Sequence, residues 1–241
     1  MAILHGINAG YVFFALLGGV FPALLWLFFW LREDKKHPEP RALLIGTFLA
    51  GVATVLLALP IEERVAALYG AGAFVTIILW AATEELLKFG ASLTTGLRSR
   101  AFDEPVDAMV YLITAALGFS AFENALFILK DLIENGSELG LLTASMRSIG
   151  ATLLHVAASA IVGGALACTF YRSRWTRAGA TLVGVVLAVA LHTLFNQLIL
   201  SSNGEKTLWV FGGLWCIIIG VILFFEYIKN SRSKTTLPSS F

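Results

Sequence analysis

The residues of this chain that could do chemistry are ionisable side chains inside otherwise apolar segments. They are Glu84, Glu85, Lys88, Glu123, His155 and His192. An ionisable group in hydrocarbon is costly unless it is paired or hydrated, so such groups are functional candidates by default. Carboxylates and imidazoles together suit two kinds of chemistry, the activation of water and the binding of a metal ion.

Helical spacing separates the roles of the two neighbouring glutamates. Lys88 is four residues from Glu84 and three from Glu85, so it can reach either carboxylate. Adjacent residues on a helix point about 100° apart, so Glu84 and Glu85 cannot face the same place. We therefore expect one of them to face a central site while the other pairs with Lys88 or with a neighbouring helix.

The first hydrolytic mechanism that these residues allow uses a metal. His155, His192 and Glu123 would bind Zn²⁺, because two histidines and one glutamate form a common catalytic zinc set with a position open for water. Glu84 would be the general base, and the metal would polarise the scissile carbonyl.

The second mechanism needs no metal. Glu84 would activate water, while His192 and Asn196, one helical turn apart, would stabilise the oxyanion. In either mechanism Glu85 with Lys88 would tune or position Glu84. Asn124 and Ser159 are expected to support the site by hydrogen bonds, or else to join helices.

The elements that must position these residues are membrane spans. The 241 residues are 58% hydrophobic and only 14% charged, which fits a bilayer protein better than a soluble domain. The net charge of +1 gives no sign of the strongly basic surface that nucleic-acid-binding proteins carry. Seven segments are apolar enough to span, and each of the key residues falls on one of four consecutive segments. The predicted spans are roughly 10–31, 41–59, 72–92, 106–128, 148–170, 179–200 and 207–228.

Basic residues predict the orientation of these spans. Twelve of them lie in the loops after spans one, three and five and in the tail, against four on the other side. This bias predicts an outer N-terminus and a cytoplasmic C-terminus.

The chain is thus expected to be an all-α transmembrane bundle in the cell membrane. It would form one peptidase domain over residues 1–228, with a catalytic core at about 72–200 and a flexible tail over 229–241. Cys168 and Cys216 are expected to be small buried hydrophobes.

At these residues the sequence resembles the PrsW family of intramembrane peptidases, which is related to the CAAX-processing and bacteriocin-processing membrane peptidases. Four blocks within about residues 80–200 carry the resemblance. They are Glu84-Glu85-Leu86-Leu87-Lys88, the stretch from Asp103 to Asn124, His155-Val156-Ala157-Ala158-Ser159, and His192-Thr193-Leu194-Phe195-Asn196.

The resemblance implies an intramembrane metallopeptidase. Its implied substrate is a single-pass membrane protein, such as an anti-sigma factor, cut near the outer face in regulated intramembrane proteolysis. Two other classes of function compete, a transporter or ion channel and a non-catalytic scaffold. The sequence shows no repeated halves with matching broken spans, which many transporters have. A scaffold does not need acids and histidines on four consecutive spans.

Overall fold

The computed structural model of the chain describes residues 8–33, 38–201 and 205–232. The regular elements in these ranges are all helices. They are α1 (Ala9–Glu33), α2 (Arg41–Tyr69), α3 (Phe74–Thr94), α4 (Asp107–Glu134), α5 (Ser137–Met146), the π-helical segment η1 (Arg147–Ala151), α6 (Thr152–Cys168), α7 (Arg174–Ser201) and α8 (Thr207–Arg232).

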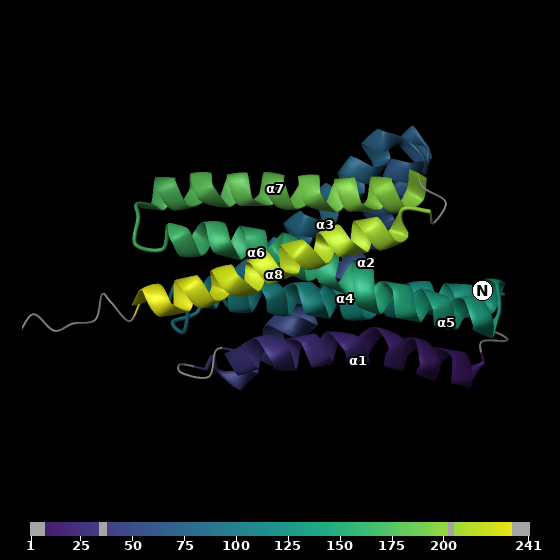
Figure 1. Ribbon diagram of the computed structural model, residues 1–241, viewed down its shortest axis with the longest axis horizontal. Coiled ribbons are helices and arrows are strands. Elements are labelled where there is room, and N and C mark those ends of the chain that lie inside the picture. The colour runs from purple at the N-terminus through teal and green to yellow at the C-terminus, as the bar shows by residue number, and fades with distance from the viewer. Residues whose placement is uncertain (1–7, 34–37, 202–204, 233–241) are drawn as a thin grey trace, which may run out of the picture.

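Two helical stretches form the centre of the bundle. Within their most apolar windows α4 is 72% buried and the continuous stretch Ser137–Cys168 is 78% buried, whereas α1, α2, α7 and α8 are 17–33% buried. Figure 1 shows α1, α4, α6 and α7 lying lengthwise beside one another, with α8 crossing at a slant. The hairpin of α2 and α3 completes the bundle, and α3 contacts α2, α4, α6 and α7. Thus α3 contacts each of the other helices that carry key residues, α4, α6 and α7.

The predicted all-α membrane bundle is confirmed. Six helical stretches in the described ranges are long and apolar enough to cross a membrane: α1, α2, α4, Ser137–Cys168, α7 and α8. The third predicted span, α3, has 21 residues but holds Glu84, Glu85 and Lys88, so its composition keeps it outside this group. Because four helices surround α3, its charges meet protein groups rather than lipid.

Two predicted span boundaries were wrong. The second span was expected to end at Pro60, but α2 continues to Tyr69. A proline removes one backbone hydrogen bond, yet the turn beyond it is held by α3, where Trp80 Nε1 donates to the carbonyl of Glu62 (3.0 Å). The stretch before residue 148 was expected to be a loop, but it is helical from Ser137 onward.

One smaller expectation fails. Cys168 and Cys216 are exposed rather than buried: Cys168 is the last residue of α6, and Cys216 lies on the mostly exposed helix α8. The predicted tail over residues 229–241 stays a prediction, and α8 ends at Arg232 within it. The rest of the predicted tail, residues 233–241, lies outside the described ranges.

Buried carboxylates hold the loops at the opposite end of α4 from Glu123. Asp107 accepts hydrogen bonds from the backbone N–H groups of Asp103 (3.0 Å) and Glu104 (2.6 Å). Glu39 is buried and accepts a hydrogen bond from the Tyr111 hydroxyl. Burial raises the pKa of the Glu39 carboxyl above its ordinary value. These contacts fasten the loops before α2 and α4 to the central helix.

Glycines let α2 and α4 pack with their backbones in contact. A Cβ atom added to Gly118 would fall on the carbonyl oxygen of Phe48, and one added to Gly51 would fall on that of Ala115. Small residues at helix crossings permit such approach, which is a major source of helix association in membranes. This contact places α4, and with it Glu123, beside the α2–α3 hairpin.

We predict that Gly118→Ala and Gly51→Ala each destabilise the protein by about 1–3 kcal/mol, because the methyl group must push two backbones apart. The measurement is unfolding in detergent micelles. Gly46→Ala on α2 is the matched control, since a Cβ there meets nothing within 4 Å. Equal stabilities for Gly118→Ala and Gly46→Ala would contradict the close packing.

The predicted orientation can be tested at the two ends of the Ser137–Cys168 stretch. Ser137 and Ser173 are both exposed. Single cysteines are placed there in a chain with Cys168 and Cys216 changed to alanine. A thiol reagent that cannot cross membranes will then label, in intact cells, only a cysteine on the outer side. We expect cells to be labelled at position 137 and not at position 173. Labelling of intact cells at position 173 would reverse the orientation.

Candidate active site

Four helices bring their ionisable residues to one buried place. α3 supplies Glu84, Glu85 and Lys88, α4 supplies Glu123, α6 supplies His155 and α7 supplies His192. Glu84 and both histidines are each at most 5% exposed, and Lys88 is fully buried. The side chains singled out by sequence therefore do lie together, although they come from segments more than 100 residues apart.

Glu85 and Lys88 form the centre of a hydrogen-bonded chain. Lys88 Nζ donates to Glu85 Oε1 at 2.6 Å and lies 2.9 Å from His155 Nδ1. The same oxygen of Glu85 is 2.7 Å from His192 Nδ1. Glu85 is thus the glutamate that pairs with Lys88, and Glu84 is the one left facing the histidines.

These contacts determine which ring nitrogen of each histidine carries the hydrogen. The ammonium of Lys88 has only donors, so His155 Nδ1 must accept, and His155 Nε2–H donates to Glu123 Oε2 at 2.9 Å. A carboxylate has only acceptors, so His192 Nδ1–H donates to Glu85. The lone pair of His192 Nε2 therefore points away from Glu85, and that of His155 Nδ1, which accepts from Lys88, lies on the side of the ring away from Glu123.

Both of these nitrogens face Glu84. Glu84 Oε2 lies 3.8 Å from His155 Nδ1 and 3.8 Å from His192 Nε2. This oxygen is buried and makes no hydrogen bond within the described residues. Three electron-rich atoms within 4.8 Å of one another suit a cation, or the hydrogens of a water molecule. The donor set Glu84, His155 and His192 thus fits a divalent metal ion.

Glu123 and Glu84 lie beside different nitrogens of the His155 ring. Glu123 contacts Nε2 of His155, the nitrogen on the opposite side of the ring from Glu84. The other partner of Glu123 Oε2 is Arg147 Nη2, at 2.6 Å. A carboxylate behind a histidine fixes the tautomer and the orientation of the ring. Glu85 orients His192 in the same way, because it accepts from Nδ1–H while Nε2 lies on the side of Glu84.

The remaining predicted residues lie at the edge of the site. Asn124 donates to Ser120 Oγ (3.1 Å) and Thr152 Oγ1 (2.9 Å), which ties α4 to the start of α6. Ser159 is buried one turn after His155, and Asn196 is half-buried one turn after His192. Neither hydrogen-bonds to its neighbouring imidazole in the described part of the chain.

Sequence reasoning missed two residues near the site. Arg147 was assigned to a loop, because the π-helical turn that carries it has no sequence signature. Glu62 lies in the part of α2 beyond Pro60, and its charge acts on Glu84, Glu123 and Lys88. Continuing the apolar pattern of α2 through Pro60 would have put Glu62 on this helix, although not beside Glu84.

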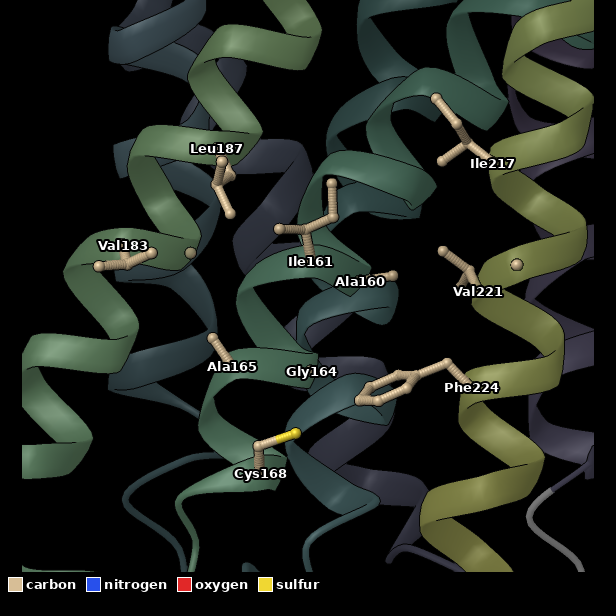
Figure 2. Close-up of a pocket in the computed structure, with 12 residues that line it drawn as sticks. Ala160, Ile161, Gly164, Ala165, Cys168, Val183, Leu187, Ile217, Val221 and Phe224 are labelled. Carbon is tan, nitrogen blue, oxygen red and sulfur yellow. The ribbon is translucent and has the colours of Figure 1, made fainter.

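An apolar groove of about 400 Å³ lies on the outside of α6, between α7 and α8. Figure 2 shows its side chains from these three helices, among them Ala160, Leu187 and Phe224. Ala160 and Leu187 are each five residues from a site histidine, which is about 7.5 Å along a helix. The groove therefore ends close to the site but is not lined by its charged residues.

Comparison with known proteins points to one protein family. The sequence matches the family described as "PrsW family intramembrane metalloprotease" over residues 39–227. Similar proteins are named Protease PrsW. The one from Geobacillus kaustophilus is 28% identical over 59% of this chain, and that match covers 64% of the relative, just under two thirds of its length. The one from Halalkalibacterium halodurans is 23% identical over 78% of this chain and 85% of the relative. No solved structure matches.

We predict that Lys88→Met destabilises the protein by about 3–5 kcal/mol, because it leaves Glu85 buried without its cation. Unfolding by denaturant in micelles measures the loss, and Lys130→Met, an exposed lysine on α4, is the control. The double variant Lys88→Met/Glu85→Gln should recover part of the loss. A loss below about 1 kcal/mol is typical of an exposed pair and would contradict the burial of this one.

Proposed function

Because this chain belongs to the PrsW family of intramembrane metalloproteases, we propose that it hydrolyses a peptide bond of a membrane-protein substrate at the Glu84, His155 and His192 cluster. The observation that carries the proposal is the buried Glu84 Oε2, which lies 3.8 Å from the lone-pair nitrogens of both histidines. The six apolar helical stretches make the protein a multi-pass protein of the cell membrane.

His155 Nδ1, His192 Nε2 and Glu84 Oε2 would hold the metal, and zinc is the ion that suits two imidazoles and one carboxylate. This proposal replaces Glu123 of the sequence-based ligand set by Glu84, since Glu123 contacts the far nitrogen of His155. A metal bound there would lower the pKa of a bound water to about 7 and polarise the scissile carbonyl.

The protein's own residues prepare this chemistry. Glu85 and Glu123 hold the two imidazoles so that one lone pair of each faces Glu84. Lys88 lies 2.9 Å from His155 Nδ1, so a metal ion at this nitrogen requires the ammonium to move towards Glu85, its other partner at 2.6 Å. Lys88 would then balance the charge of Glu85 beside the metal-bound site.

A metal-free mechanism is the second candidate. The spacing of the three atoms also suits one water molecule, from which Glu84 would take the proton. His192 would stabilise the oxyanion together with Asn196 when it carries a second hydrogen on Nε2, since its Nδ1–H donates to Glu85. In both mechanisms we propose a single-pass membrane protein as substrate, with an anti-sigma factor as the specific candidate. Such a substrate can bring a peptide bond to a buried site through the lipid.

We predict that Glu84→Gln abolishes cleavage, lowering its rate by on the order of 10²–10⁴-fold. The assay is co-expression with a single-pass reporter that carries the outer segment of an anti-sigma factor, read as product size on a gel. Glu63→Gln, an exposed glutamate on α2, should cleave normally. Cleavage by Glu84→Gln at the normal rate would refute the proposed function.

Elemental analysis of the same purified variants tests the metal. We expect about one zinc ion per chain in the unchanged protein, with loss of zinc in His155→Ala, His192→Ala and Glu84→Gln. Zinc retained in Glu84→Gln but lost in Glu123→Gln would instead restore Glu84 as the general base beside the sequence-based ligand set. An active protein that holds no metal and resists chelators would establish the metal-free mechanism.

A further inference from the structure

Arg147 stands at a break in the helix that carries His155. It begins the π-helical segment Arg147–Ala151, which joins α5 to α6. A π-helical turn inserts an extra residue and is less stable than an α-helical turn, so it persists mostly where a side chain must be redirected. Here the turn directs Arg147 towards α4.

The guanidinium of Arg147 contacts three residues of one face of α4. Nη2 donates to Glu123 Oε2 at 2.6 Å, and Nε donates to Asn124 Oδ1 at 2.6 Å. The guanidinium also lies 3.9 Å from the ring centre of Phe127. A planar guanidinium fixed at three points gives its carboxylate partner a defined position, which a lysine cannot do.

One oxygen connects Arg147 to the site. Glu123 Oε2 accepts from both Arg147 Nη2 (2.6 Å) and His155 Nε2 (2.9 Å). Arg147 thereby keeps a charged oxygen against Nε2, and this contact holds the hydrogen on Nε2 and leaves Nδ1 for the side of Glu84.

Joining α4 to α6 does not by itself require Arg147. Asn124 and Ser120 already reach Thr152 Oγ1 through buried hydrogen bonds. Arg147 and Glu123 are also more accessible than His155. Their side chains are 19% and 17% exposed, against 2% for that of His155. A small cation from solution can therefore reach the place of the guanidinium.

We propose that Arg147 is a positioning residue of the peptidase, which holds Glu123 against Nε2 of His155 and so fixes the orientation of the His155 ring. This inference rests on the proposed function for its kinetic consequence, while its structural part concerns His155 alone. Carboxylates behind a site histidine typically contribute 10–100-fold to activity or metal affinity. We expect a loss of about that size from kcat, with KM unchanged.

The kinetic test uses Arg147→Ala and the single-pass reporter in micelles. We expect kcat to fall about 10–100-fold and to recover in part when guanidinium or ethylguanidinium ions are added at concentrations that do not unfold the protein. Arg147→Lys should remain impaired, and Arg64→Ala, an exposed arginine on α2, should match the unchanged protein. In a Glu123→Gln background, Arg147→Ala should cause no further loss.

A second measurement does not depend on cleavage. Solid-state ¹⁵N NMR of histidine-labelled protein, with His155→Gln to assign the signal, reports the tautomer of His155. We expect the Nε2–H form in both proteins, because Lys88 opposes a hydrogen on Nδ1. In Arg147→Ala we expect the Nε2 signal to shift and broaden, because Glu123 is no longer held against Nε2. An unaltered His155 signal in Arg147→Ala, or full activity of that variant, overturns the proposal. If the signal changes as expected but the unchanged protein cleaves nothing, the proposed function fails while the positioning by Arg147 stands.

Discussion

The constraint on which this structure depends is that charged groups inside the membrane must satisfy one another. They do so in one chain of contacts that runs Arg147, Glu123, His155, Lys88, Glu85, His192, with neighbouring atoms 2.6–2.9 Å apart. Cations, carboxylates and imidazoles succeed one another so that each contact joins a donor to an acceptor. Removing Lys88 would leave Glu85 buried without its cation, at a cost of several kcal/mol.

This chain of contacts explains the arrangement of the helices. Its members come from α3, η1, α4, α6 and α7, so the chain forms only when these elements are neighbours. α4 and α6 supply the close, apolar centre, and glycines such as Gly51 and Gly118 allow the backbone contact of α2 with α4. The charged residues of α3 are buried while Leu86 is exposed, so the helices that α3 contacts provide the polar surroundings that lipid cannot.

Glu84 stands outside this chain of contacts, and we assign the chemistry of the site to it. The oxygens of Glu85 and Glu123 that orient the histidines are already bonded, whereas Glu84 Oε2 is buried without a hydrogen bond among the described residues and lies near both rings. A buried polar atom without a partner is costly in any protein interior and more so in a membrane. A cation or a polarised water at this place would relieve that cost, and these are the species that the proposed hydrolysis would use.

The sequence by itself determined the bundle of helices and the identity of the key residues, because apolar runs of spanning length and charges inside them are local properties of the chain. It also separated Glu84 from Glu85, since their angular offset follows from helix geometry alone. Only the tertiary structure decided that Glu85 takes Lys88 and His192, that Glu123 lies behind His155, and that Glu84 faces both rings. These facts depend on the rotation of each helix about its axis, which is set by packing between distant segments. For the same reason Arg147 and Glu62 could not be placed from sequence: a π-helical turn and the packing of α2 beyond Pro60 bring them to the site.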